Sequence, residues 1–96
     1  SSIYVLACLP KPHWLVIRDM GVVCAQVLAF HEEALRHAES KAIERIDVSG
    51  QWWRQVVDGQ SRVAAHWHPD VEALSALAPE IAASYQSVLV KGSRFM

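Results

Sequence analysis

The residues best suited to chemistry in this chain form a short basic loop near its end. Lys91, Gly92, Ser93 and Arg94 directly follow the apolar run at residues 88–90. Two cations, a hydroxyl and a flexible backbone are groups that hold phosphates and other anions. Because ligands of open parallel sheets collect beyond the carboxyl ends of the strands, we interpret this loop as a candidate anion site. A solvated turn after a strand is the alternative that the spacing alone leaves open.

Asp19 occupies a similar position, since it follows a second apolar run at residues 14–17. A single acid at the end of a strand binds a ligand, caps a helix or faces solvent, and the sequence leaves all three open. His66 and His68 alternate along a predicted strand, so their rings fall on the same face. Zinc needs a third or fourth ligand, and the sequence nominates none. His31 borders the apolar stripe of a predicted helix, where a packed or hydrogen-bonded histidine is the ordinary case.

The common signatures of phosphate binding and hydrolysis are missing from the sequence. It contains neither a P-loop nor a Gly-x-Gly-x-x-Gly turn, so we do not expect an independent nucleotide site. No Ser/His/Asp or Cys/His arrangement has a motif to support it, so hydrolytic catalysis has little basis.

Composition and charge exclude several classes of protein. The 96 residues are 52% hydrophobic and 20% charged, as in one soluble globular domain. The net charge of -1 offers no basic surface for nucleic acid. No segment approaches the roughly 18 consecutive apolar residues of a membrane span, and residues 1–9 do not have the basic start and apolar core expected of a signal peptide. Cys8 and Cys24 lack the Cys-x-x-Cys spacing, so we expect two reduced thiols in a cytoplasmic protein.

The elements that position these residues are expected to alternate between strand and helix. Apolar runs predict strands at residues 14–17, 45–48, 62–67 and 87–90, and residues 88–90 are expected to be buried on both faces. Helical spacing predicts helices at residues 1–9, 25–40 and 51–57 and after residue 68, the last broken or kinked by Pro79. Strands separated by helices favour right-handed crossovers. We therefore predict a single α/β domain over residues 1–96, three-layered and Rossmann-like, with a mainly parallel sheet of about four strands flanked by helices.

The predicted helix at residues 25–40 carries more apolar residues than packing on one sheet face requires. Its expected core stripe is Phe30, Ala34 and Ala38. Tyr4, Trp52 and Trp53 add aromatic groups, and the two adjacent tryptophans are not both expected in the core. A wide apolar arc with exposed aromatics is typical of protein interfaces, and a generous core in a small domain is the alternative. The surplus apolar residues are Val22, Val23, Cys24, Val27, Leu28 and Leu35.

Residues 16–20, His31, Gly50 and residues 89–94 together resemble the C-terminal domain of Mur ligases. The similarity covers about residues 2–96. Within the family it is greatest to the members that add a D-alanyl-D-alanine dipeptide to the peptidoglycan precursor. The resemblance implies a Rossmann-like domain that closes over a central ATP-binding domain. Such a domain helps to position the nucleotide and the incoming amino-acid substrate for an acyl-phosphate ligation.

Individual residues extend the resemblance. Asp19 matches the aspartate of the family's Gly-Asp-Met, and His31 matches the histidine of the following helix. Lys91, Ser93 and Arg94 match its Lys-Gly-Ser-Arg loop, so these five residues are implied as ancestral ligand contacts. ATP and magnesium would bind only in the full-length bacterial parent. Because the central P-loop domain is missing, we expect no cofactor here and no enzyme activity from this chain alone. The resemblance also implies a domain truncated at both ends.

The departures from the family pattern cluster in one region. Arg18 stands where the family has a glycine, Val22 where it has a glutamate, and Cys24 and Leu35 where glycine is typical. Such changes remove a polar loop and add apolar bulk. We therefore predict a non-catalytic protein-binding module on a repurposed, engineered scaffold, whose partner is another protein or a second copy. The alternative is the excised C-terminal domain of a divergent ligase, inactive without its central domain. The predicted interface is Val22, Val23, Cys24, Val27, Leu28 and Leu35, with Tyr4, Trp52 and Trp53 at or near it.

Overall fold

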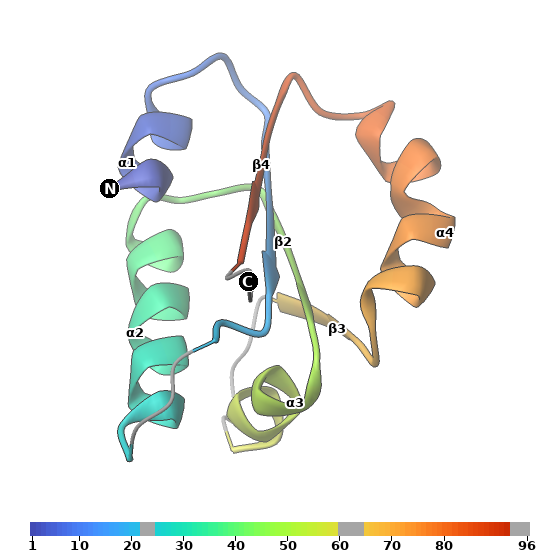
Figure 1. Ribbon diagram of the computed structural model, residues 1–96. Coiled ribbons are helices and arrows are strands. Elements are labelled where there is room, and N and C mark those ends of the chain that lie inside the picture. The colour runs from blue at the N-terminus through green and yellow to red at the C-terminus, as the bar shows by residue number, and fades with distance from the viewer. Residues whose placement is uncertain (22–24, 60–64, 93–96) are drawn as a thin grey trace.

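The computed structural model describes residues 1–21, 25–59 and 65–92 and shows a four-stranded parallel sheet flanked by helices (Figure 1). The strands are β1 (His13–Arg18), β2 (Arg45–Ser49), β3 (Ala65–His68) and β4 (Ser87–Lys91). The helices are α1 (Ser2–Ala7), α2 (Val27–Ser40), α3 (Gln51–Asp58) and α4 (Val71–Ala82). The predicted α/β class and three-layer, Rossmann-like architecture are confirmed. Residues 60–64, where the third predicted strand begins, lie outside the described residues.

The strand order β3-β2-β1-β4 places a reversal between β1 and β4. From β1 the chain moves in one direction through α2, β2, α3 and β3, with both helices on the same face of the sheet (Figure 1). α4 then crosses the opposite face and returns the chain to β4, beside β1. When all crossovers are right-handed, connections that run in opposite directions along the sheet place their helices on opposite faces. The carboxyl edge between β1 and β4 is therefore a topological switch point, where ligands of such sheets bind.

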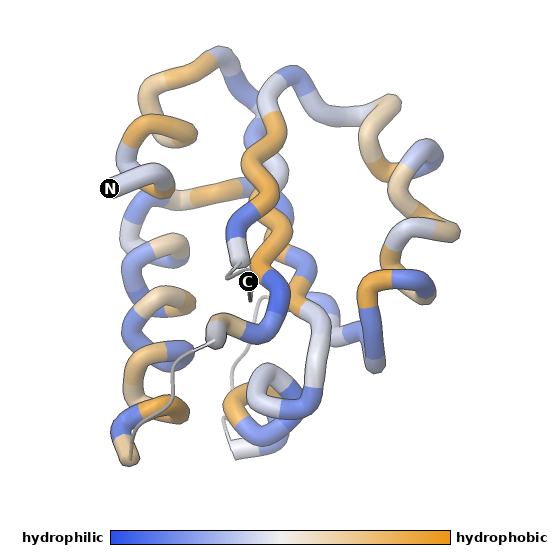
Figure 2. Tube along the Cα trace, in the orientation of Figure 1, coloured by the Kyte–Doolittle hydropathy of each residue, from blue (hydrophilic) through white to orange (hydrophobic). Residues whose placement is uncertain are grey.

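Hydrophobic residues on the two faces of the sheet form two cores of unequal size. The smaller core lies under α4, where Trp14 and Val16 pack against Leu74. Figure 2 shows hydrophobic residues along the strands of the sheet and on the helices that flank it. No helix within residues 1–21, 25–59 and 65–92 is long and apolar enough to cross a membrane. The larger core lies under α1, α2 and α3, and its buried strand residues are Leu15, Ile17, Ile46 and Val48.

The buried face of α2 differs from the predicted one. Phe30, which belongs to the predicted core stripe, is 52% exposed. The prediction fails because hydrophobicity alone places His31 outside the core, whereas both of its ring nitrogens are hydrogen-bonded and the ring can be buried. The helix is thereby rotated relative to the predicted stripe. Its buried residues are Val27, His31, Leu35 and Ala38.

β4 is an edge strand, which contradicts the prediction that residues 88–90 are buried on both faces. Leu89 packs on the larger core, but Val88 and Val90 are 51% and 64% exposed. These two valines lie on the face that α4 covers, and α4 packs mainly over the other strands. An apolar run predicts a strand of a parallel sheet, but it does not reveal whether helices cover both of its faces.

α4 continues through Pro79, so the predicted break does not occur. Proline lacks the N–H that would bond to the carbonyl of Ser75, four residues earlier. Both residues are exposed, so water can hydrogen-bond to that carbonyl. The opposite side of the helix is held on the sheet by Leu74, Ala78 and Ile81.

Candidate functional site

The carboxyl edge of the sheet at the switch point is the candidate functional site. Lys91 ends β4, and Asp19 directly follows β1, which is its neighbour in the sheet. The structure therefore brings two predicted site residues to one edge. Ser93 and Arg94, from the same predicted loop as Lys91, lie outside the described residues.

The carboxylate of Asp19 caps the N-terminus of α3. It accepts hydrogen bonds from the backbone N–H groups of Trp52 and Trp53, both at 3.3 Å. A negative charge at this position is stabilised by the unpaired N–H groups and by the helix dipole. Of the three roles that the sequence left open, Asp19 has the capping role. Because the carboxylate fills this position, the phosphates of the nucleotide that the family resemblance implies do not fit there.

Gly50 makes the approach of Asp19 to α3 possible. Its backbone has φ 116° and ψ 173°, a conformation that is essentially restricted to glycine. A Cβ atom at this position would overlap the carboxyl group of Asp19. The carbonyl of Gly50 also accepts a hydrogen bond from the indole N–H of Trp67 at 2.8 Å, which joins this turn to β3.

His31 holds the loop after β1 against α2. Its Nε2 accepts from the backbone N–H of Met20 at 3.0 Å, so the ring proton is on Nδ1, which donates to the carbonyl of Val27 at 2.7 Å. Trp53 packs edge-on against this ring, with 4.8 Å between the ring centroids, and donates its indole N–H to the carbonyl of Arg18 at 2.9 Å. Both nitrogens of His31 are thus engaged within the protein. His31 positions the site loop and leaves no ring nitrogen for a ligand.

A pocket of about 220 Å³ opens beside Lys91 at the switch point. We call it the β1–β4 pocket, and its lining residues are Met20, Phe30, Glu33, Ala34, His37 and Lys91. Half of this lining is apolar and half is titratable. The α2 residues among them recur at intervals of three and four, so one face of the helix forms the wall.

Two serines at the start of α1 hold the basic groups of the β1–β4 pocket. Lys91 Nζ donates to Ser2 Oγ at 3.4 Å, and His37 Nε2 lies 3.1 Å from Ser1 Oγ. An ammonium group has three N–H donors, so Lys91 keeps two donors beyond its bond to Ser2. The pocket can therefore bind an anionic group at Lys91 while its apolar wall contacts the rest of the ligand.

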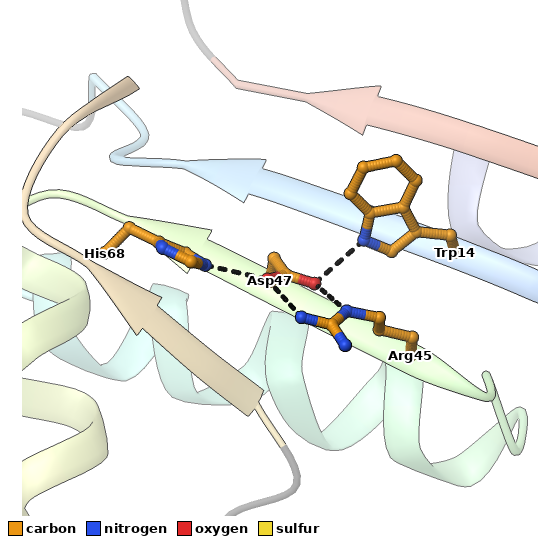
Figure 3. A network of polar contacts seen from close by, with 4 residues as sticks. All are labelled: Trp14, Arg45, Asp47 and His68. Carbon is orange, nitrogen blue, oxygen red and sulfur yellow. Dashed lines mark hydrogen bonds and ion pairs between the residues drawn. The ribbon is translucent and has the colours of Figure 1, made fainter. Parts of the chain in front are cut away.

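A second cluster of polar side chains lies on the opposite face, within the sheet (Figure 3). We call Trp14, Arg45, Asp47 and His68 the Asp47 network. Asp47 Oδ1 accepts from Trp14 Nε1 at 2.8 Å and from Arg45 Nε at 2.7 Å. Asp47 Oδ2 lies 3.2 Å from an Arg45 Nη and 2.7 Å from His68 Nε2. Burial raises the pKa of Asp47, but hydrogen bonds from Arg45, His68 and Trp14 outweigh it and hold that pKa below its ordinary value.

Three residues of the predicted protein interface are buried, which corrects that part of the prediction. Val27 and Leu35 lie on the inner face of α2, and Trp53 is enclosed in the larger core. Leu28 is half-buried and packs against the same core. The apolar surplus of α2 is therefore mainly core, which is the alternative that the sequence left open.

The other predicted interface residues are separated or lie outside the described residues. Tyr4 and Trp52 are exposed, but they belong to different helices, α1 and α3. The expectation that Trp52 and its neighbour are not both in the core is confirmed. The residues that lie outside the described ranges are Val22, Val23 and Cys24.

Asp47 and the polar residues of α2 that line the pocket were not among the predicted site residues. Asp47 stands between Ile46 and Val48, and a charged residue inside an apolar strand signals a buried, paired carboxylate. Glu33 and His37 are four residues apart, so they lie on the same side of the helix. Their spacing was visible in the sequence, but their position beside Lys91 depends on the strand order.

No model of a known protein family matches this chain, and no curated protein matches it. What the chain binds must therefore be inferred from its own residues and geometry.

Proposed function

We propose that this chain binds a small ligand with an anionic group in the β1–β4 pocket, as the substrate-binding C-terminal domain of a Mur-ligase-like enzyme. The observation that carries the proposal is the place of Lys91, whose ammonium group lines a pocket at the topological switch point. An ammonium group with free donors beside an apolar wall suits a carboxylate or phosphate on a partly apolar molecule.

The other lining residues favour an amino acid or a short peptide. Glu33 can pair with a ligand ammonium group, while Phe30 and Ala34 offer contact area for short apolar side chains. A volume of about 220 Å³ is below that of pockets for drug-sized ligands, which start at about 300 Å³. A zwitterion with small side chains therefore matches the charges and the size of the pocket.

The family resemblance suggests a particular zwitterion. The family that the sequence resembles includes ligases that add D-alanyl-D-alanine to the peptidoglycan precursor, and Lys91 matches the family's Lys-Gly-Ser-Arg loop. The dipeptide carries a terminal carboxylate, a terminal ammonium group and two methyl groups. It is therefore the probe of choice for the β1–β4 pocket.

Replacing Lys91 with methionine is expected to weaken the binding of D-alanyl-D-alanine by about 10- to 100-fold, because it removes one charge-assisted hydrogen bond. Titration of the dipeptide into the ¹⁵N-labelled protein measures the affinity through backbone amide shifts. The shifts should concentrate at Met20, Ala34, His37 and Lys91.

The matched control is Lys41→Met. Lys41 Nζ lies 5.0 Å from the ring centroid of Tyr4 and does not line the pocket, so this variant should bind as the wild type does. The dipeptide with a C-terminal amide lacks the carboxylate. Its affinity for the wild type should be as low as the affinity of the unmodified dipeptide for Lys91→Met. Equal affinities of Lys91→Met and wild type would overturn the proposal.

A second candidate function is binding between copies of this chain through the edge strand β4. Exposed Val88 and Val90 favour it, since they form an apolar strip on an open sheet edge. Antiparallel pairing of two β4 strands about Leu89 would place Lys91 opposite Ser87, so that no like charges meet. In this case the chain would be the repurposed or engineered binding module that the departures from the family pattern suggest.

Replacing both Val88 and Val90 with threonine tests this second candidate. Threonine keeps the strand propensity but reduces the apolar area, so a dimer of the wild type should become monomeric. Sedimentation velocity over a range of protein concentrations measures the change. A wild type that stays monomeric at millimolar concentration contradicts the candidate.

A further inference from the structure

The carboxyl ends of β1, β2 and β3 carry a row of polar residues on the face of α4. Arg18, Ser49 and His68 are the last residues of the three strands, and they are neighbours in the sheet register. By the alternation of side chains, they share this face with Trp14 and Asp47. A guanidinium, a hydroxyl and an imidazole therefore end adjacent strands on one face. The β1–β4 pocket, lined by α2, lies on the other face.

Ser49 has a hydroxyl group with no hydrogen-bond partner among the described residues. The residue is 2% exposed, and its Oγ atom is buried. A buried hydroxyl without a partner carries a desolvation cost, and in native proteins such groups nearly always bond to protein, water or ligand. Ser49 Oγ therefore carries a hydrogen-bond donor that no described residue uses.

His68 is held in place by the Asp47 network (Figure 3). Its Nε2 lies 2.7 Å from Asp47 Oδ2, and its side chain is 12% exposed. Asp47 fixes the ring so that, in the doubly protonated form, Nε2–H donates to the carboxylate and Nδ1–H remains as a donor. No hydrogen bond of Nδ1 occurs within residues 1–21, 25–59 and 65–92.

The charges around this row favour an anion. Arg45 is paired with Asp47 at 2.7 Å, so the buried carboxylate is already neutralised. Arg18 is exposed and forms no ion pair with any described residue. Its aliphatic stem lies beside Gly92, where a Cβ would come within 2.9 Å of the Arg18 Cβ, so the glycine leaves room for the side chain. The unpaired guanidinium and the doubly protonated imidazole are the two cationic donors of the row, and the hydroxyl of Ser49 is its neutral donor.

We propose that Arg18, Ser49 and His68 bind an oxyanion of the phosphoryl class on the α4 face of the sheet. Three donors from three adjacent strands suit a tetrahedral group with several acceptor oxygens, and arginine matches such oxygens with two parallel N–H groups. The Asp47 network orients His68 and does not touch the ligand. This site is separate from the β1–β4 pocket, so its failure and that of the proposed function are distinguishable.

Titration of inorganic phosphate into the ¹⁵N-labelled protein tests the site at constant ionic strength, with sodium chloride as the reference salt. We expect saturable amide shifts at Ser49, Gly50 and His68 with phosphate and none with chloride. Arg18→Gln should weaken phosphate binding about tenfold, in keeping with the loss of one charge-assisted contact. Parallel titrations with methyl phosphate and acetate show whether the site recognises a phosphoryl group or any anion, since only methyl phosphate carries a phosphoryl group.

Two further variants keep the test decisive. Ser49→Ala removes a buried hydroxyl that has no protein partner, so the protein should fold at least as stably as the wild type and still lose phosphate affinity. Arg54→Gln removes an exposed arginine of α3 and should bind phosphate normally. If Arg18→Gln and Ser49→Ala both bind phosphate as the wild type does, the site does not exist. Lys91→Met should leave these shifts unchanged, which separates this site from the β1–β4 pocket.

Discussion

Asp47→Asn is expected to lower the free energy of unfolding by about 3–5 kcal/mol, the usual cost of breaking a buried ion pair. Asp47 is fully buried, and both of its oxygens accept hydrogen bonds from Trp14, Arg45 and His68. An asparagine keeps one oxygen but turns an NH₂ group toward these donors. The guanidinium of Arg45 would also lose its counter-charge. Urea unfolding monitored by tryptophan fluorescence measures the loss.

The control for this variant is Asp58→Asn. The carboxylate of Asp58 lies 3.7 Å from Arg54 Nε, and both side chains are exposed. Exposed ion pairs of this kind contribute about 0–1 kcal/mol, so this variant should unfold close to the wild type. Comparable losses for Asp47→Asn and Asp58→Asn would show that the Asp47 network adds nothing to stability.

The same variant should change how stability depends on pH. Because the folded protein holds the pKa of Asp47 below its ordinary value of about 3.9, the stabilisation is complete above that value and is lost as the pH falls through the folded pKa. The difference in stability between wild type and Asp47→Asn should therefore shrink below about pH 4. The pKa of Glu44 is lowered by a hydrogen bond from the backbone of His13. Because Glu44 is present in both proteins, its contribution cancels in the difference between their stabilities.

Gly50→Ala is expected to destabilise the protein by about 3 kcal/mol. The conformation at φ 116° and ψ 173° costs a residue with a Cβ about 1–3 kcal/mol. The new Cβ would also displace the carboxylate of Asp19 and remove the cap of α3, which is worth about 1 kcal/mol. Thermal unfolding followed by circular dichroism measures the change.

Gly59→Ala is the matched control within the same helix. Gly59 ends α3 with φ −82°, which alanine adopts readily, and its Cβ would come no closer than 3.2 Å to the carbonyl of Gln55. We expect a change within about 1 kcal/mol, since only a small adjustment of that carbonyl is needed. If the two glycine variants are equally stable, the close approach of Asp19 to Gly50 is not a constraint on the fold.

The family resemblance and the structure assign different roles to the same residues. The resemblance implied Asp19 and His31 as ancestral ligand contacts. In the structure Asp19 caps α3 and His31 bonds to Met20 and Val27, so both act within the protein. Lys91, another member of that set, lines the β1–β4 pocket. A motif identifies residue types at a spacing, whereas the role of each residue depends on which partners the fold brings within reach.

The sequence by itself determined the α/β class, the parallel sheet and the carboxyl-end position of Lys91 and Asp19. Apolar runs and helical spacing are local patterns, and they predict the strands and helices. The alternation of strand and helix along the chain then favours right-handed crossovers and a parallel sheet. The turn at Gly50, directly after β2, could also be predicted from the local sequence.

Only the tertiary structure decided which faces are buried and what each polar group contacts. It made β4 an edge strand with exposed Val88 and Val90, and it placed His31 on the buried face of α2. It also joined Asp47 to His68, which is 21 residues away in the chain. The physical reason is that hydrogen bonds and packing between distant segments select the orientation of a helix and the order of strands. Local hydrophobicity, which is all that the sequence pattern reports, is compatible with several of these arrangements.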